Sequence, residues 1–316
     1  MRDIPAAVRA KALDAGASAW LTELPRLIDG LCREWGLRPG VTFGDATEAY
    51  VVSVTRNDGT PAVLKVLVPR RSAAAAHEMT VLRLAAGDGC CRLYEYDEGR
   101  GALLLEHLGP SMADLNIPQP RRLEILTDLA SALWRPTGAD LPTAVTRAEW
   151  QASYIPRKWS ELGKPCSAAA VDQALAAAES RRRAWNPARA VLIHGDVHQW
   201  NALSVPALAD EPSLLGRLAP GDDPAEAAFR LVDPDGLIAE PECDLGVLMR
   251  EDPVELMESD PWDRARWLAA RTGTDPQAIW EWGLVERVTT GLVLTVAGVQ
   301  PVAAQMLAAA DYISRR

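Results

Sequence analysis

The stretch VLIHGDVHQWNAL, residues 191–203, places two histidines, an aspartate and an asparagine directly after a short apolar run. It supports two interpretations. Imidazole and carboxylate groups at close spacing are typical of a zinc or iron site, with His194, Asp196 and His198 as ligands. Alternatively, the loop uses the oxygens of Asp196 and of Asn201, which follows five positions later, at the end of a strand. Residues elsewhere in the chain decide between the two.

A second apolar run, FRLVD, also ends in an aspartate, Asp233. If the two strand ends meet, Asp196, Asn201 and Asp233 form a cluster of hard oxygen ligands, which suits Mg²⁺ bound to the phosphates of a substrate. Phosphoryl transfer also needs a cation that holds the nucleotide phosphates, fixed by an acid on a helix. Lys65 in the strand-like run AVLKVLV and Glu78 in the helical run AHEMTVLRL supply this pair of charges.

The first third of the chain is dominated by strand patterns. Residues 17–35 carry apolar side chains at steps of three and four, which predicts an amphipathic helix. Two hairpins follow, one with its turn at residues 57–59 and one with its turn at residues 98–101. We therefore expect a small antiparallel sheet after the leading helix.

From residue 121 onward the apolar spacing is helical, apart from short strand-like runs. The predicted fold class is α+β, with a strand-rich lobe over residues 1–108 and a larger helical lobe over residues 109–316. The Pro- and Asp-rich stretch 205–228 is predicted to be a surface insertion between two strands of a hairpin.

Composition and charge narrow the class of partner. The net charge of -10 argues against nucleic acid, whose backbone needs a basic surface, and suits a neutral or cationic small molecule. The five cysteines form no CxxC pair, and the first residues lack an apolar signal segment, so we expect a cytoplasmic protein. The apolar stretch 291–310 is interrupted by Pro301 and predicts buried helices rather than a membrane span. A monomer is the default expectation.

The order of these motifs resembles the protein-kinase-like fold, and within it the aminoglycoside phosphotransferase superfamily. HGDVHQWN matches the H-G-D-x-H-x-x-N catalytic loop of that superfamily, and AVLKV is similar to the kinase V-A-I-K strand. LVDPDGLIAEPECDLG resembles the branch that contains streptomycin 6-phosphotransferases and hydroxyurea phosphotransferases. AWLTELPRLIDGLCREWGL, DGTPAVLKVLVPR and LLLEHLGPS are also similar to that branch, so the resemblance spans most of the chain.

The resemblance implies a role for each matching residue of the loop. Asp196 is expected to be the catalytic residue that orients the acceptor hydroxyl, and Asn201 and Asp233 are expected to hold Mg²⁺. The first histidine of the loop would support it from beneath, and Asp244 in ECDLG would brace the site rather than react. Under this interpretation neither histidine is a metal ligand.

The resemblance likewise assigns the nucleotide contacts to the strand-rich lobe. Lys65 is expected to contact the phosphates of ATP and to pair with Glu78, and the backbone at Glu106 and Leu108 is expected to bind the adenine edge. The nucleotide-covering loop departs from the kinase pattern, because the run FGDATEAYVV contains only Gly44.

The acceptor is the least determined part of the prediction. Streptomycin carries two guanidinium groups, which call for acidic side chains, and the candidate contacts are Trp200, Glu251, Asp252 and Glu255. The run VTTGLVLTVAGVQP contains no acid where the resemblance predicts an acidic pair. The expected function is ATP- and Mg-dependent phosphorylation of a streptomycin-type aminoglycoside at its 6-hydroxyl, conferring resistance. The alternatives are a kinase for hydroxyurea or another small metabolite, and a kinase-like binding or regulatory protein without turnover.

Overall fold

The computed structural model separates into two compact units. The first comprises Met1–Pro110 and Leu203–Val232, and the second comprises Ser111–Ala202 and Asp233–Arg316. Within them the structure describes residues 4–44, 46–69, 74–206 and 224–316. The division differs from the predicted boundary after residue 108, because residues 203–232 belong to the first unit.

The first unit is built on a five-stranded antiparallel sheet with the order β1-β2-β3-β5-β4. Both predicted hairpin turns are confirmed. At the first, Arg56 N–H donates to Thr60 O at 2.9 Å; at the second, Gly101 N–H donates to Glu98 O at 3.2 Å. The strands are β1 (Leu37–Thr42), β2 (Ala49–Arg56), β3 (Pro61–Leu67), β4 (Leu93–Asp97) and β5 (Ala102–Glu106).

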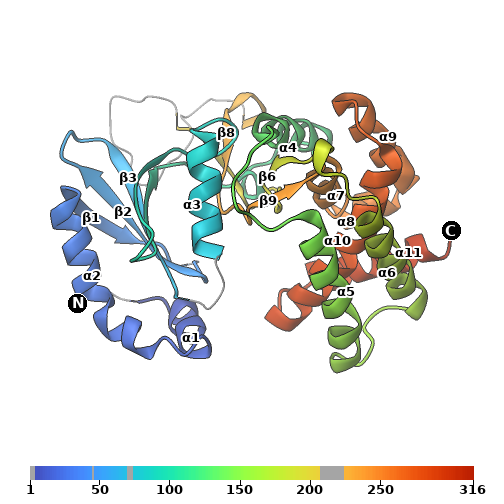
Figure 1. Cartoon of the computed structure of the whole chain (residues 1–316), viewed down its shortest axis with the longest axis horizontal. Helices are drawn as coiled ribbons and strands as arrows, with labels where there is room; N and C mark the ends of the chain where they lie inside the picture. The colour runs from blue at the N-terminus through green and yellow to red at the C-terminus, as the bar shows by residue number, and fades with distance from the viewer. Residues whose placement is uncertain (1–3, 45, 70–73, 207–223) are drawn as a thin grey trace. The chain divides into compact units, whose positions relative to one another are not determined.

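Helices cover both faces of this sheet (Figure 1). The predicted leading helix is α2 (Ser18–Glu34), preceded by α1 (Ala6–Asp14), and its buried side chains share one apolar cluster with Leu64 and Val66 of β3. Because side chains alternate along a strand, Lys65 points to the opposite face, where α3 (Ala74–Ala85) carries Glu78. The sheet therefore separates an apolar layer from a charged one.

A short hairpin explains why residues 203–232 join the first unit. β7 (Ala202–Ser204) and β8 (Phe229–Leu231) form a two-stranded sheet, and they flank the predicted insertion, of which residues 207–223 lie outside the described residues. Gly109 N–H donates to Ser204 O at 2.7 Å, and Cys91 N–H donates to Leu231 O at 2.8 Å. The hairpin is thus hydrogen-bonded to the chain just before β4 and just after β5.

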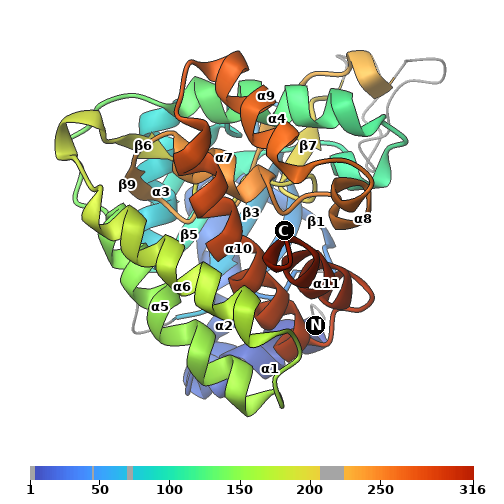
Figure 2. The ribbon, with the colours of Figure 1, turned by 90° about the vertical axis from the view of Figure 1, so that its right-hand side faces the viewer.

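The second unit is mainly helical and is organised around α10 (Pro276–Ala297). Figure 2 shows α10 between α6 and α11, and it also packs on α7, α9 and α5. An apolar cluster from α5, α6, α10 and α11 fills the space between them. The other helices are α4 (Gln119–Leu133), α5 (Ala144–Glu161), α6 (Ala168–Arg183), α7 (Glu242–Leu248), α8 (Pro253–Met257), α9 (Pro261–Thr272) and α11 (Val302–Ser314).

One pair of short strands in this unit positions the loop quoted at the outset. β6 (Val191–Ile193) pairs antiparallel with β9 (Leu237–Ala239), with Leu192 opposite Ile238. Ile193 and Leu237 are buried in a cluster with Trp282 of α10. An antiparallel sheet in one unit and a helical majority in the other confirm the predicted α+β class. Of the helices in the described parts of the chain, none has the length and apolar character needed to cross a membrane.

Candidate active site

The loop between β6 and β7 is held from below by a buried carboxylate. Asp244 on α7 is fully buried; its Oδ1 accepts from Gly195 N–H at 2.7 Å, and its Oδ2 accepts from His194 N–H at 3.1 Å and from Trp134 Nε1–H at 3.1 Å. Burial raises the pKa of Asp244, opposed by the charge of His194 and by these hydrogen bonds. The prediction that Asp244 braces the loop is therefore confirmed.

Gly195 has a backbone conformation and a tight contact that only glycine allows in this loop. Its φ of 85° lies in the left-handed region that favours glycine, and a Cβ there would lie 3.1 Å from Cβ of Asp235 and 3.0 Å from Cδ1 of Leu237. The segment that contains these two residues thus packs directly on the loop. Gly236 N–H also donates to His194 O at 3.3 Å. Residues 235–237, which follow Asp233 in the chain, therefore lie against the loop that contains Asp196.

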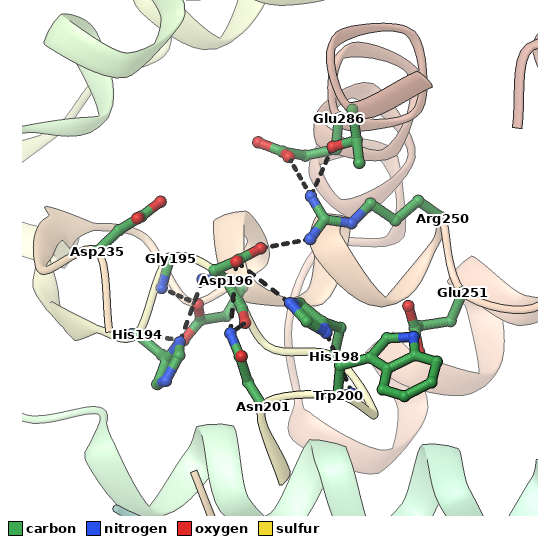
Figure 3. A network of polar contacts seen from close by, with 12 residues as sticks. His194, Gly195, Asp196, His198, Trp200, Asn201, Asp235, Arg250, Glu251 and Glu286 are labelled. Atoms are coloured by element: carbon green, nitrogen blue, oxygen red, sulfur yellow. Dashed lines mark hydrogen bonds and ion pairs between the residues drawn. The ribbon is translucent and has the colours of Figure 1, made fainter. Parts of the chain in front are cut away.

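Asp196 lies at the centre of a polar network (Figure 3). Its Oδ2 is 3.2 Å from His198 Nε2, its Oδ1 accepts from Arg250 Nη2–H, and its side chain remains 31% exposed. Burial alone would raise the pKa of the carboxyl group, but His198 and Arg250 outweigh it and hold that pKa well below its usual range. Asp196 is therefore ionised at neutral pH and still accessible to a substrate.

The ring nitrogens of the two histidines form hydrogen bonds within the loop. His194 is buried, and its Nδ1 accepts from Asp196 N–H at 3.2 Å, which supports the loop from beneath. His198 Nδ1 accepts from Trp200 N–H at 3.2 Å, while its Nε2 contacts Asp196. Both ring nitrogens of His198 and one of His194 are thus engaged by the loop itself, which favours the interpretation that uses Asp196 and Asn201.

Asn201 is oriented by its amide nitrogen. Its Nδ2–H donates to Asp196 O at 3.1 Å and lies 3.4 Å from Asp196 Oδ2. Both contacts use the amide nitrogen, so the amide oxygen, the kind of atom that Mg²⁺ prefers as a ligand, takes no part in the contacts with Asp196. Asp233 has an exposed side chain and a φ of 58°, a backbone conformation that costs a non-glycine residue free energy and is typical of functional turns. Both residues offer oxygen donors of the kind that a hard divalent cation prefers.

The first unit holds the predicted cation and its acidic partner. Lys65 Nζ is 2.6 Å from Glu78 Oε1, with side chains only 9% and 8% exposed. At the end of β5, the Glu106 carboxylate accepts from Arg92 N–H at 3.0 Å and is 3.3 Å from Arg230 Nη1. This side chain is therefore used within the sheet, as is the backbone N–H of Glu106, which donates to Arg92 O at 2.9 Å. Leu108 is buried and follows where the chain leaves the sheet.

The four acceptor candidates are placed differently. Trp200 is 60% exposed and lies beside the loop (Figure 3). Glu251 is buried and accepts from Gln199 N–H at 3.2 Å, and Asp252 Oδ1 accepts from Arg122 Nη2–H at 2.5 Å. Both of these carboxylates accept hydrogen bonds from other groups of the protein. Glu255 lines a cavity of about 630 Å³ together with Glu124, Glu258, Asp263 and Trp267.

Sequence reasoning missed three residues that contact Asp196 directly or through other side chains: Arg250, Glu286 and Arg147. Arg250 bridges Asp196 and Glu286, and Arg147 contacts Glu286 from α5. A signal was present, because Glu286 stands in the apolar helical run WGLVERV, as Lys65 stands in an apolar strand. Only the folded chain shows that Arg147 and Arg250 reach it.

Comparison with known proteins gives a family and a fold. Residues 34–291 match the family described as aminoglycoside/hydroxyurea antibiotic resistance kinase. Streptomycin 6-kinase of Streptomyces glaucescens is 33% identical over 148 residues, which cover 40% of this chain and 48% of that protein. The chain thus spans about half the length of this relative. Hydroxyurea phosphotransferase of Kitasatospora aureofaciens is 29% identical over 245 residues, which cover 72% of this chain and 71% of that protein.

Among solved structures, a thermostable mutant of the aminoglycoside phosphotransferase APH(4)-Ia, in a ternary complex with AMP-PNP and hygromycin B, covers 93% of this chain and 98% of its own. The TM-score is 0.57 at 14% identity. At this identity the likeness establishes the fold alone, which is that of the aminoglycoside kinases, and the predicted protein-kinase-like fold is confirmed.

Proposed function

We propose, from the premise that this chain belongs to the aminoglycoside/hydroxyurea antibiotic resistance kinase family, that it transfers phosphate from ATP to a hydroxyl group of a small-molecule antibiotic. The observation that carries the proposal is an ionised Asp196 in a loop braced by Asp244, with Asn201 oriented beside it. Such a constellation suits a reaction in which little covalent chemistry is required of the protein beyond positioning and electrostatics.

Asp196 would accept a hydrogen bond from the acceptor hydroxyl and orient that oxygen toward the phosphate. Because phosphoryl-transfer transition states are loose, the hydroxyl proton leaves late, and a strongly basic residue is not needed. The lowered pKa of Asp196 is compatible with this role, since the residue acts mainly by orientation and by its negative charge.

Bound Mg²⁺ would supply charge neutralisation on the nucleotide phosphates. In this chain the Asn201 amide oxygen and the Asp233 carboxylate would hold it, because both offer hard oxygen donors. Lys65, fixed by Glu78 at 2.6 Å, would contact the phosphates, and the backbone at Glu106 and Leu108 would bind the adenine edge. Within the first unit, the ion pair with Glu78 fixes the position of the lysine ammonium group.

For the acceptor we propose a streptomycin-type aminoglycoside, phosphorylated at its 6-hydroxyl. The 33% identity to a streptomycin 6-kinase supports this choice, and the exposed ring of Trp200 beside the loop would stack on a guanidinium group. Glu255, in an acid-lined cavity, is the remaining acidic candidate for the second guanidinium.

Hydroxyurea or another small metabolite is the second candidate acceptor. Two observations favour it over streptomycin: Glu251 and Asp252 are already engaged by Gln199 and Arg122, and residues 288–301 contain no acid. The similarity to a hydroxyurea phosphotransferase covers 72% of this chain, more than the similarity to the streptomycin kinase does. A small neutral acceptor needs no acidic pair.

The test is transfer of labelled phosphate from ATP, with Mg²⁺, to a panel of streptomycin, hydroxyurea, 2-deoxystreptamine aminoglycosides and viomycin. Asp196→Ala serves as the control. Transfer to streptomycin or to hydroxyurea that disappears in Asp196→Ala identifies the acceptor. ATP binding without transfer or hydrolysis, unchanged in Asp196→Ala, would instead support the kinase-like binding protein without turnover.

A further inference from the structure

Arg250 follows α7 and joins the loop to the central helix of the second unit. The residue is 5% exposed; its Nη2–H donates to Asp196 Oδ1, and its Nη1–H donates to Glu286 Oε2 at 3.1 Å and to Thr290 Oγ1 at 2.7 Å. Figure 3 shows the guanidinium group between the two carboxylates. Because the guanidinium is rigid and planar, its contact with α10 determines where it can hold Asp196.

The contacts continue beyond Glu286. This residue is 1% exposed, and its Oε1 accepts from Arg147 Nε–H at 3.0 Å and from Gln151 Nε2–H at 2.7 Å. Arg147 Nη1–H donates in turn to Asp235 Oδ2 at 2.8 Å. Asp196, Arg250, Glu286, Arg147 and Asp235 therefore form a series of alternating charges, here called the Asp196 cluster, from the loop to the segment that contains Asp233.

The free-energy cost of burying these charged groups suggests that the Asp196 cluster has a role beyond stability. Taking charged groups out of water costs several kcal/mol per ion, and apolar side chains of similar volume often give equal or greater stability. An Asp196 carboxylate held on both oxygens, by Arg250 and by His198 at 3.2 Å, has its plane fixed relative to α10 and to the loop. Phosphoryl transfer depends on such fixed geometry.

We propose that Arg250 is a positioning residue for Asp196, and that Glu286 and Arg147 extend this positioning to the turn carrying Asp233 and Asp235. The inference rests on the proposed function, since it assigns Asp196 to the reacting hydroxyl. In this arrangement α10 sets the orientation of the catalytic carboxylate through one arginine and aligns it with the metal-binding segment through another.

The kinetic test compares Arg250→Met with Arg250→Lys. Arg250→Met releases Asp196, so we expect kcat to fall about 10²-fold, as for a catalytic group displaced by about 1 Å, while KM for ATP stays within about twofold. Arg250→Lys keeps the charge without the planar fork and should recover about a tenth of the wild-type kcat. Equal losses in the two variants, or kcat of Arg250→Met within about twofold of wild type, would overturn the proposal.

The matched control is Arg287→Met on the same helix. Arg287 is 1% exposed and donates to Met249 O at 2.5 Å, so it is an equally buried arginine next to Glu286 that does not touch the Asp196 cluster. We expect its loss to lower the melting temperature and to leave kcat unchanged. Arg147→Met, which acts on Asp196 only through Glu286, should lower kcat by about tenfold, less than Arg250→Met. A kcat loss in Arg287→Met equal to that of Arg250→Met would show a merely structural effect.

A readout without turnover separates this inference from the proposed function. Melting temperatures of wild type, Asp196→Asn, Arg250→Met and the double variant give the coupling between the two side chains. We expect the double variant to shift less than the sum of the single variants, whether or not any acceptor is phosphorylated. Additive shifts would overturn the positioning contact, whereas non-additive shifts without any transfer would overturn only the proposed function. If Arg250→Met fails to fold, Arg250→Lys replaces it in the same cycle.

Discussion

The two units of the molecule bury charge in different ways. In the first unit, Lys65 and Glu78 form a pair of one cation and one acid at 2.6 Å, on a strand and on the helix that follows it. In the second, the Asp196 cluster joins three acids to two arginines drawn from distant parts of the chain. The pair is local to one strand and the helix that follows it, whereas the cluster exists only when distant segments of the chain are brought together.

The largest expected effect is the loss of Asp196 itself, at the substrate end of the cluster. Asp196→Asn removes the charge that orients the acceptor hydroxyl, and we expect kcat to fall about 10³-fold, within the range for catalytic acid–base residues. ATP affinity, measured by calorimetry, should be unchanged, because the nucleotide contacts are assigned to Lys65. Asp128→Asn, which removes an exposed carboxylate paired with Arg271, is the control. A variant that kept more than about a tenth of the wild-type kcat would place the reacting group elsewhere.

The next largest expected effect is a loss of folding stability when Glu286 is replaced. Glu286→Leu leaves Arg250 and Arg147 buried together without the acid they share, so we expect the free energy of unfolding in urea to fall by about 3–5 kcal/mol. Glu124→Gln, which breaks an exposed pair with Arg121, should cost less than about 1 kcal/mol. Equal losses in the two variants would mean that the cluster is no more coupled than a surface pair.

The same contrast explains what the sequence could and could not predict. Lys65 stands out because a charge in an apolar strand requires a partner, and Glu78 lies on the next element, only 13 residues away. The loop was predictable because its residues are contiguous from His194 to Asn201. The sheet, both hairpin turns and the leading helix followed from local periodicity. In that helix, however, Ile28 is 1% exposed whereas Leu27, which fits the three-and-four spacing, is only partly buried, because the sheet decides which face is covered.

The missed features depend on contacts between distant segments. Arg147 and Glu286 are 139 residues apart, and Arg250 and Asp196 are 54 apart, so no local pattern connects them. The acceptor candidates illustrate the same limit. Glu251 and Asp252 looked like exposed acids in a charged run, yet folding places one against the loop backbone and the other against Arg122. Residues 203–232 likewise belong to the first unit because Ser204 and Leu231 accept hydrogen bonds from Gly109 and Cys91.

Lys65→Met tests the pair of Lys65 and Glu78 in the first unit. We expect a smaller effect than from the substitutions of Asp196 and Glu286. Lys65→Met removes the cation assigned to the nucleotide phosphates, and we expect kcat/KM for ATP to fall about 10²-fold, the order seen when one donor to developing charge is lost. Lys158→Met, in an exposed pair with Glu161, is the control and should leave kcat/KM unchanged. An unchanged kcat/KM in Lys65→Met would show that the pair is structural and that phosphate binding lies with other residues.

The smallest expected effect concerns Glu251, which is next to Arg250 of the Asp196 cluster. Its pKa is raised, whereas that of Asp196 is lowered, so the two acids affect stability in opposite pH ranges. Burial raises the pKa of Glu251 above the ordinary value of 4.5, against the charges of His198 and Arg250. The stability linked to this group is therefore present below about pH 4.5 and is lost as the pH rises through the folded-state pKa. Glu251→Gln, whose amide oxygen still accepts from Gln199 N–H, should gain stability relative to wild type as the pH rises from 4.5 to 7.5 in urea titrations.

Asp196→Asn supplies the contrast in the same titrations. Since His198 and Arg250 hold the pKa of Asp196 well below 3.8, against burial, the stability linked to its ionised form is lost only as the pH falls below that value. Because Asp196 also raises the pKa of His198, the comparison is made in a His198→Gln background, where the stability difference between Asp196→Asn and its parent should stay constant from pH 4.5 to 7.5. Two variants of adjoining acids with the same pH dependence would contradict the view that cations compensate Asp196 and leave Glu251 uncompensated. A rising difference for Glu251→Gln beside a constant one for Asp196→Asn would show that Glu251 is buried with less compensation of its charge than Asp196.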